Sequence, residues 1–425
     1  MKEALLQYAW QHKLFYSNNL MTVKREKVEV IDPGQLNTHA GPDFFNAKIK
    51  IGSTLWAGNI EVHVNSSDWK HHHHSEDHAY DNVILHVVAN QDTDIHRPNG
   101  EELEQLILPY YEGLEQKYET LLNQNTFVAC ANHLKQVPRI LMTAWKNTLL
   151  TERLEQKVND IERLLANTQN NWEEAFYITL ARNFGTSINA TPFELLAKSL
   201  PQNYLGKHKD NLLQIEALLF GQSGLLTQAP ADNYTTSLKQ EYAFLKSKYQ
   251  LQPIDPHLWK LLRLRPHNFP HIRIAQFASL TYQSTNLFSK IVNAKSLIEM
   301  EALFICKASE YWQSHYTFGK FSATKDKPLG KPTIKILLIN TVSPFLFAYG
   351  RYRGNEQMQE KALNLLEQLT PEQNSIISNW RLYCVTTTSA FDTQALIHLK
   401  KNYCDLKKCL RCRIGHFVLS QNTPA

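Results

Sequence analysis

The sequence lacks the features that would place it in a membrane or in a disulfide-bonded secreted class. No run approaches the roughly 18 consecutive apolar residues of a membrane-spanning helix. The N-terminal segment carries Glu3, Gln7 and His12 inside its apolar pattern, unlike a secretory signal. Only six cysteines occur in 425 residues, and four of them lie at or beyond Cys384, which is not the pattern of a disulfide framework. These absences predict a cytoplasmic protein with no membrane partner.

Several nucleotide-binding and hydrolase motifs are also missing. Gly221-Gln222-Ser223-Gly224 lacks the lysine and the spacing of a phosphate-binding P-loop, and neither G-x-S-x-G nor G-x-G-x-x-G occurs. The net charge of +5 is mild and does not by itself imply a nucleic-acid partner. Hydrophobic residues make up 43% and charged residues 20% of the chain, a normal balance for a soluble globular protein. A chain of this length predicts two or three domains.

The pattern of apolar residues divides the chain into three parts. Residues 1–125 predict an α/β domain, because strand-like and helix-like segments alternate there. Residues 135–383 are dominated by amphipathic helical stretches without a fixed repeat period, so they predict a large irregular all-α domain. Residues 384–425 form a basic segment rich in cysteine, which we expect to pack on the helical domain.

The N-terminal elements follow a recognisable order. A helix is predicted over Glu3 to Phe15 and a strand over Lys27 to Ile31. A hairpin around Gly52 follows, then a helix over Trp69 to Tyr80 and a buried strand over Asp81 to Ala89. The predicted order is therefore helix, three strands, helix and strand.

The two strands of this hairpin carry two acidic residues, Asp43 and Glu61, and one histidine, His63. If a three-residue loop, Gly52 to Thr54, joins the strands, Asp43 opposes His63 and Phe45 opposes Glu61. Asp43, Glu61 and His63 then share one face, and a slip of one residue would move Asp43 to the other face. The same face would carry the apolar residues Ala47, Ile49, Ile51, Leu55 and Ala57.

Pro42-Asp43 and Glu61-Val62-His63 resemble the metal-binding motif of the PD-(D/E)XK nuclease superfamily, with His63 in the place of the usual lysine. The resemblance implies a restriction-endonuclease-like core in which Asp43 and Glu61 bind Mg²⁺ or Mn²⁺ for phosphodiester hydrolysis. It leaves His63 or Lys70 to supply positive charge or a base, and Glu3 as an accessory carboxylate. An inactive descendant of that fold, or an ordinary strand pair with polar ends, would show the same residues.

The chain also resembles, nearly end to end, an uncharacterised bacterial family known as a domain of unknown function. The matching segments are Gly34-x-x-Asn37, Gly41-Pro42-Asp43-Phe44, Gly58-Asn59-Ile60-Glu61-Val62-His63, Ser67-Asp68-Trp69-x-x-His72, Leu85-His86-Val87-Val88, Tyr403-Cys404 and Cys409-Leu410-x-Cys412. This resemblance implies relatedness and no activity.

Histidines are concentrated near the N-terminus, where His71 to His74 form an uninterrupted run. On a helix His74 and His78 would share a face at the i,i+4 spacing that can bind a transition metal. A solvated polar helix face explains the same pattern. His86, inside the strand Asp81 to Ala89, is more typical of a core hydrogen bond than of a metal ligand.

The C-terminal cysteines have a spacing typical of metal sites. Cys404, Cys409 and Cys412 supply a Cys-x4-Cys-x2-Cys series, and Cys384 is the expected fourth ligand, with His398 or His416 as alternatives. Four such ligands suit Zn²⁺ or an iron–sulfur cluster. Buried reduced thiols are the alternative reading.

Two basic segments are candidates for contact with DNA or RNA. Lys407, Lys408 and Arg411 surround the cysteines, and Arg263, Arg265 and Arg273 lie in a segment that we expect to be an extended loop. A solvated tail and an interdomain loop are the alternatives. The sequence therefore supports two hypotheses, a divalent-metal-dependent nuclease and a non-catalytic nucleic-acid-binding or scaffold protein with a structural metal.

Overall fold

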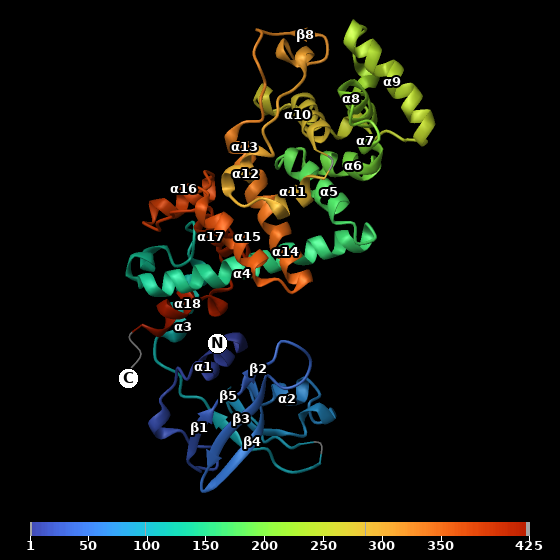
Figure 1. Cartoon of the computed structure of the whole chain (residues 1–425). Coiled ribbons are helices and arrows are strands. Elements are labelled where there is room, and N and C mark those ends of the chain that lie inside the picture. Colours follow the sequence, from blue (N-terminus) through green and yellow to red (C-terminus); the bar gives the residue numbers. More distant parts are fainter. Residues whose placement is uncertain (1, 98, 285, 422–425) are drawn as a thin grey trace. The chain divides into compact units, whose positions relative to one another are not determined.

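The computed structural model describes residues 2–97, 99–284 and 286–421, and these residues form two compact units. Unit 1 comprises Met1–Lys146, Ser378–Thr386 and Ile397–Ala425. Unit 2 comprises Asn147–Ile377 and Thr387–Leu396. Figure 1 shows the strands of the N-terminal sheet in the blue part of the chain and helices through most of the remainder. The prediction of a mixed α/β N-terminal region followed by a large helical region is confirmed.

Unit 1 is built on one mixed sheet. Its strands lie in the order β1-β3-β4-β5-β6, and the short β2 pairs with β3. β3 is antiparallel to β1 and β4, whereas β4, β5 and β6 are parallel. The strands are β1 (Val28–Asp32), β2 (Gln35–Leu36), β3 (Phe44–Ile51), β4 (Thr54–Asn65), β5 (Val83–Asn90) and β6 (Gln105–Ile107). β4 is therefore a central strand, and the consecutive residues 60–63 are buried on both of its faces.

The hairpin between β3 and β4 differs from the predicted one. Its turn has two residues, because Ile51 pairs with Thr54, and Gly52 takes a positive φ of 58° that glycine adopts readily. This shifts the register by one residue. A β-bulge between Phe44 and Ala47 shifts it again, because Asn46 adopts φ 58°. The predicted pairings of Asp43 with His63 and of Phe45 with Glu61 are therefore wrong.

Short helices border this sheet and connect its strands. The predicted helix over Trp69 to Tyr80 is instead one helical turn, α2, followed by a loop and a 3-10 turn, η2. The helical elements of unit 1 before the long helix α4 are α1 (Glu3–Gln11), η1 (Ser17–Asn19), α2 (Asp68–His71), η2 (His78–Tyr80), α3 (Leu114–Asn123) and η3 (Ala131–Gln136).

The predicted C-terminal segment is divided, because residues 384–386 and those from Ile397 onward belong to unit 1, whereas residues 387–396 belong to unit 2. Helix α18 (Arg413–Ser420) buries Ile414, Val418 and Leu419 and contacts α3. The Lys407 ammonium donates a hydrogen bond to the Gln124 carbonyl at 2.9 Å. The π-helical turn η9 (Leu399–Cys404) and the 3-10 turn η10 (Cys409–Arg411) precede α18. Residues distant in sequence thus complete the N-terminal unit.

Unit 2 is helical apart from a small hairpin of β7 (His315–Thr317) and β8 (Lys320–Phe321). Its core contains fully buried aromatic residues such as Phe176, Phe277 and Trp312. Three helices, α4, α16 and α17, cross the boundary between the units. The α-helices from α4 onward, α18 aside, are α4 (Arg139–Asn167), α5 (Trp172–Phe184), α6 (Ala190–Ser199), α7 (Gln202–Gly206), α8 (Leu212–Gln222), α9 (Asn233–Tyr249), α10 (Pro270–Gln283), α11 (Leu287–Asn293), α12 (Leu297–Ala302), α13 (Lys331–Leu337), α14 (Ser343–Arg353), α15 (Glu356–Gln368), α16 (Ser375–Leu382) and α17 (Ala390–His398).

The helical stretch Lys331–Arg353 is long and apolar enough to cross a membrane by length and composition alone. Within the protein, however, 67% of its most apolar window is buried. Leu337, Leu338 and Leu346 are completely buried there. Such burial is typical of a core helix in a soluble protein.

Candidate functional site

Asp43 and Glu61 lie side by side where β3 begins against the middle of β4. The Asp43 backbone N–H donates a hydrogen bond to the Glu61 carboxylate at 3.0 Å, and the Val62 N–H donates one to the Asp43 carboxylate at 3.1 Å. The shorter turn alone would place Asp43 and Glu61 on opposite faces of the hairpin. The bulge at Asn46 shifts the register by a second residue, so the two side chains lie on the same face. The structure therefore brings together the two carboxylates that the sequence singles out, although by a different register.

The environment of this pair disfavours negative charge. Burial raises the pKa of Asp43, and the nearby Glu61 carboxylate raises it further. Burial also raises the pKa of Glu61, an effect that the Asp43 N–H partly offsets and Glu3 reinforces. Glu3 lies on α1, half-buried, and accepts a hydrogen bond from Gln7 at 3.3 Å. Three carboxyl groups thus gather in one partly enclosed place, where a cation would stabilise their ionised forms.

Two imidazoles contact the Glu61 carboxylate, and a third lies against one of them. His63 Nε2 lies 3.4 Å and His74 Nε2 lies 3.2 Å from Glu61 Oε1. His72 Nδ1 lies 3.1 Å from His63 Nε2. One ring nitrogen from each of the three histidines lies within 4.8 Å of the other two. His63 is 2% and Glu61 4% exposed, whereas His72 is exposed and leaves the site open to solvent on that side.

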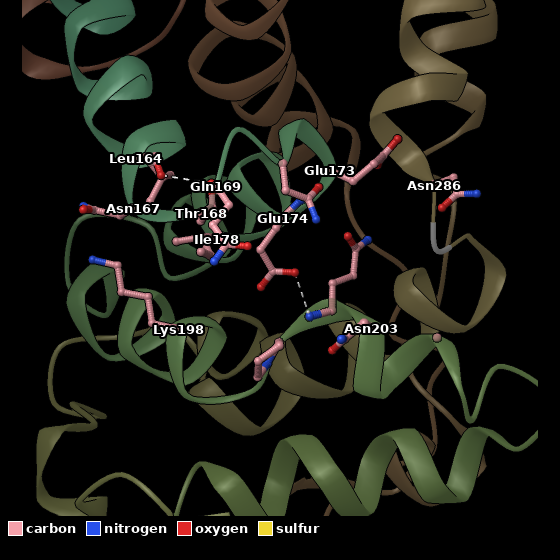
Figure 2. A pocket seen from close by; sticks show the side chains of 14 residues that line it. Leu164, Asn167, Thr168, Gln169, Glu173, Glu174, Ile178, Lys198, Asn203 and Asn286 are labelled. Atoms are coloured by element: carbon pink, nitrogen blue, oxygen red, sulfur yellow. Dashed lines mark hydrogen bonds between the residues drawn. The ribbon is translucent and has the colours of Figure 1, made fainter. Parts of the chain in front are cut away.

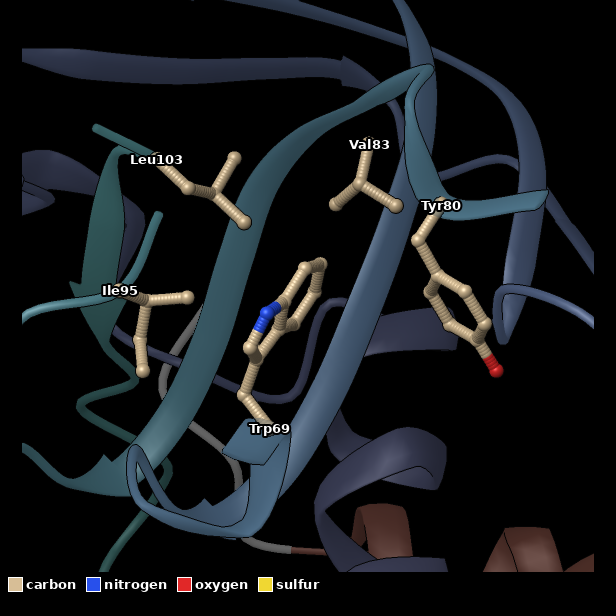
Figure 3. Close-up of a cluster of buried hydrophobic side chains, with 5 residues drawn as sticks. All are labelled: Trp69, Tyr80, Val83, Ile95 and Leu103. Carbon is tan, nitrogen blue, oxygen red and sulfur yellow. The ribbon is translucent and has the colours of Figure 1, made fainter. Parts of the chain in front are cut away.

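The loop after α2 carries His72 and His74 to the site because the chain reverses there. His73 takes a left-handed φ of 60°, which ends the helix, and the His74 N–H donates to the Trp69 carbonyl at 3.1 Å. Trp69 is completely buried in a cluster with Tyr80, Val83, Ile95 and Leu103, which Figure 3 shows between the strands. The cluster therefore anchors the short helix from which the histidine loop leaves.

Two further aromatic side chains, His86 and Tyr80, contact the rings of His63 and His74. His63 Nδ1 lies 2.9 Å from Nε2 of His86, a completely buried residue that pairs in register with Glu61 across β4 and β5. The His74 ring stacks on Tyr80 with centroids 3.8 Å apart. Burial lowers the pKa of His63 to about 3 and also lowers the pKa of His74, so both rings are neutral near pH 7. Neutral imidazole is the form that binds metals.

The distances fit a single metal ion. Ligands bonded to one ion at about 2.1 Å are roughly 3.0 Å apart along an octahedral edge and roughly 3.4 Å apart along a tetrahedral edge. The distances from His63 to His72 and from Glu61 to His63 and His74, at 3.1–3.4 Å, fall in this range. Three imidazoles with one carboxylate favour a transition metal such as zinc, manganese or iron over magnesium.

Two residues expected near this site are directed elsewhere. The Lys70 ammonium donates to the Thr93 hydroxyl at 3.0 Å on an exposed surface. His78 is exposed and lies 3.0 Å from the Asp81 carboxylate, so the predicted His74–His78 pair is wrong. The reason is that the helix that would have placed them on one face ends at His71.

The C-terminal cysteines gather with a different partner from the expected one. Cys130, Cys404, Cys409 and Cys412 line one cavity of about 20 Å³. Cys384 is exposed and does not line it. Neither histidine alternative lines it, and His416 Nδ1 lies 2.7 Å from the Tyr8 hydroxyl. The prediction of Cys384, His398 or His416 as fourth ligand is therefore wrong for this cluster.

The candidate nucleic-acid contacts are scattered. Arg273 is buried in α10, where its guanidinium donates to Asn268 and Thr333, so it is not a surface contact. The expected extended loop is instead a 3-10 turn, η6 (Pro266–Asn268), that leads into α10. Arg263 and Arg265 are exposed in unit 2, and Lys408 and Arg411 are exposed in unit 1. Lys407 is engaged with the Gln124 carbonyl.

A broad cavity of about 870 Å³ lies in unit 2, and none of these residues lines it. Figure 2 shows Glu173 and Glu174 at its wall. The Glu174 carboxylate accepts the Gln202 N–H at 3.0 Å, and Glu173 accepts the N–H and hydroxyl of Ser289. Both carboxylates are thus used to connect helices. This cavity offers no cluster of groups comparable with the one around Glu61.

Comparison with known proteins gives a family and no activity. The family described as Protein of unknown function (DUF2851) matches residues 3–375. The chain belongs to this family. No curated protein and no solved structure is significantly similar to it. The matched range contains all the residues around Glu61 and ends before Cys404.

Sequence reasoning missed His72 and Cys130 as members of these clusters. His72 could have been recognised from its place in the His71 to His74 run next to a buried tryptophan. Cys130 gives no such signal, because it stands alone in the sequence, far from Cys404. Only the tertiary structure brings it to the other thiols.

Proposed function

We propose that unit 1 is a metal-dependent phosphodiesterase that hydrolyses nucleic acid, on a core of the PD-(D/E)XK nuclease type. The order α1-β1-β3-β4-α2-β5, with β5 parallel to β4, supports this proposal because it is the order of helices and strands in that superfamily. We assign Asp43, immediately before β3, Glu61 in β4 and Glu3 on α1 to the positions of its three acidic residues.

The observation that carries the proposal is the convergence on Glu61. Two neighbouring strands fix the Asp43 and Glu61 carboxylates through backbone hydrogen bonds, and His63 and His74 lie within 3.4 Å of the Glu61 carboxylate. Buried carboxylates beside neutral imidazoles are costly to assemble unless a cation occupies the space between them. The arrangement is therefore better explained by metal binding than by packing alone.

The residues would divide the work of hydrolysis. Glu61, His63, His72 and His74 would hold the metal, with Asp43 beside it, and the bound ion would activate water and neutralise charge on the phosphate. Glu3 is the candidate general base, because burial raises its pKa and Gln7 donates a hydrogen bond to it. Water would attack phosphorus, Glu3 would accept its proton, and the bond from phosphorus to the leaving oxygen would break.

The site departs from the superfamily pattern at one position. His63 stands where lysine is usual, and Lys70 binds Thr93 instead of facing the carboxylates. The positive charge that lysine would provide must then come from the metal. The three imidazoles therefore lead us to expect Mn²⁺, Zn²⁺ or Fe²⁺ to support activity better than Mg²⁺.

A second candidate function is supported by the same missing lysine. Without a lysine at the carboxylates, unit 1 would bind a metal and a nucleic acid without cleaving it. Lys408 and Arg411 in unit 1, and Arg263 and Arg265 in unit 2, are exposed and suited to phosphate contacts. The logarithm of the binding constant falls linearly with the logarithm of the salt concentration, and loss of two such contacts would make that slope shallower by about 2.

The deciding experiment is cleavage of pooled single- and double-stranded DNA and RNA with Mg²⁺, Mn²⁺, Zn²⁺ or Fe²⁺. The wild type is compared with Glu61→Ala and Asp43→Ala, and with His71→Ala as a matched control outside the cluster. Cleavage that both carboxylate variants lose and His71→Ala retains supports the nuclease. Metal binding that requires Glu61, with no cleavage under any condition, supports the second candidate. Wild-type metal affinity in Glu61→Ala would refute both.

A further inference from the structure

Four cysteines from distant parts of the chain line one small cavity in unit 1. Cys130 precedes η3, Cys404 ends η9, Cys409 begins η10 and Cys412 precedes α18. We propose that these four thiolates bind one structural zinc ion, which joins the C-terminal segment to the segment after α3. The site would be separate from the one around Glu61.

The backbone around the cavity is shaped to hold the thiols together. The Cys412 N–H donates to the Cys409 carbonyl at 3.2 Å, which closes the tight turn of the Cys-x2-Cys pair. Gly415 follows on α18, where a Cβ atom would overlap the Cys409 carbonyl oxygen. On the other side, the Cys130 carbonyl accepts the His133 N–H at 3.0 Å and so begins η3. Two separately stabilised turns thus bring four cysteines to the wall of one cavity.

The size and the lining of the cavity indicate what would fill it. A volume of about 20 Å³ accommodates roughly one atom-sized guest. A single metal ion fits such a space. Four thiolates without other ligands form a closed tetrahedral set, the usual composition of a structural zinc site. Lys408 also lines the cavity and would partly balance the net negative charge of a zinc ion with four thiolates.

The proposed ion would act as a link between segments far apart in sequence. The protein already joins them with polar contacts, such as that from Lys407 to the Gln124 carbonyl. A structural zinc site adds its binding energy to folding, because the unfolded chain does not hold the ligands together. We therefore expect the metal to stabilise unit 1 and to have little effect on unit 2.

Metal analysis of the purified full-length protein tests the proposal. Cells are grown with both zinc and iron, and His72→Ala is the background, so that zinc at the other site does not add to the count. We expect about one zinc per chain, and X-ray absorption should show only sulfur neighbours at about 2.3 Å. Cys130→Ser and Cys404→Ser should lose this zinc. Cys384→Ser, at an exposed position, and Cys306→Ser, at a buried position in unit 2, should keep it.

A measurement on the unaltered cysteines covers the case in which Cys130→Ser does not fold. When the His72→Ala protein is titrated with a mercurial thiol reagent, we expect the zinc to be released as about four thiols that were protected by the metal react with the reagent. Zinc that stays at full stoichiometry in a folded Cys130→Ser protein would overturn the assignment. So would loss of zinc in Cys384→Ser, iron with sulfide in place of zinc, or protein that contains neither metal. None of these outcomes bears on cleavage at Glu61, so the two proposals fail separately.

Discussion

Asp43 and Glu61 are joined by a hydrogen bond from the backbone N–H of one to the carboxylate of the other, 3.0 Å long. A second bond returns from the Val62 N–H to the Asp43 carboxylate. The strand pairing therefore positions both side chains before any ligand binds. This matters for function because a preorganised pair of carboxylates loses little freedom on binding a metal.

Glu61→Gln should separate stability from metal binding. The pKa of Glu61 is raised by burial, so the stability of the metal-free protein falls as the pH rises from the usual glutamate pKa towards the raised one. Gln cannot ionise and retains a carbonyl acceptor for the Asp43 N–H. We expect the metal-free variant to melt above the metal-free wild type at pH 9 and to gain much less from added Zn²⁺. Thermal unfolding with and without the metal measures both effects, and Glu29→Gln, on the exposed part of β1, is the control.

His72→Ala should weaken metal binding at little cost to folding. His72 is exposed, so its truncation is expected to change the free energy of unfolding by no more than about 0.5 kcal/mol. Loss of one ligand should reduce zinc affinity at least about 10-fold. His71→Ala is the matched control, because His71 is also exposed but contacts Asp68 instead of the cluster. Equal affinities for the two variants in a competition titration would contradict the assignment of His72.

Glu216 should make unit 2 less stable as the pH rises. Burial raises the pKa of Glu216 to about 7, although Ser309 and Tyr234 donate hydrogen bonds to it. The folded state therefore binds the proton more tightly than the unfolded state. Stability from this group is present below about pH 4.5 and is lost as the pH rises to about 7, with a maximum slope of about 1.4 kcal/mol per pH unit.

Glu216→Gln should remove that part of the pH dependence. Urea unfolding at pH 5 and pH 8 measures it, and peptide-resolved hydrogen exchange across α8 assigns the transition to unit 2. We expect the wild type to lose more stability than the variant between these pH values. An equal loss in the two proteins would show that Glu216 does not titrate in this range.

Tyr8→Phe should weaken the packing of helix α18 against helix α1, because it removes the hydrogen bond between Tyr8 and His416. The Tyr8 hydroxyl lies 2.7 Å from His416 Nδ1, and loss of such a buried hydrogen bond costs about 1 kcal/mol. Amide exchange in α18 should then be about 5-fold faster, if it proceeds through local opening. Tyr352→Phe, at a largely exposed position in unit 2, should leave α18 unchanged. Unchanged exchange in the Tyr8 variant would show that the contact is not stabilising.

The sequence predicted which residues gather at the site better than how they are held. Asp43, Glu61 and His63 were expected on one face, and they do lie together, yet the expected three-residue loop is wrong. Two local departures compensate for each other, because the tight turn at Gly52 and the bulge at Asn46 each shift the register by one residue in the same direction, and a total shift of two residues keeps the side chains on the expected face. Both depend on left-handed backbone at single residues, which the hydrophobic pattern does not encode.

The histidine loop and the cysteine cluster show a further limit. A helix-cap sequence precedes the run from Trp69 to Tyr80, but a left-handed residue at His73 ends the helix and turns His74 inward. Spacing identified Cys404, Cys409 and Cys412 because they are close in sequence. Their neighbour Cys130 depends on the packing of α18 against α3, a long-range contact that no local pattern contains.

The discontinuity of unit 1 has a consequence for the order of events during synthesis. Met1–Lys146 leaves the ribosome first, but Ile397–Ala425, which completes the same unit, is made only after unit 2. Helix α1, which carries Glu3, therefore lacks its contact with His416 until the segment that follows unit 2 has been made. A nascent chain stalled before η9 would have a folded unit 2 and an unfinished unit 1. Any activity that requires a complete unit 1 would consequently begin only after Ile397 and the residues that follow it have been made.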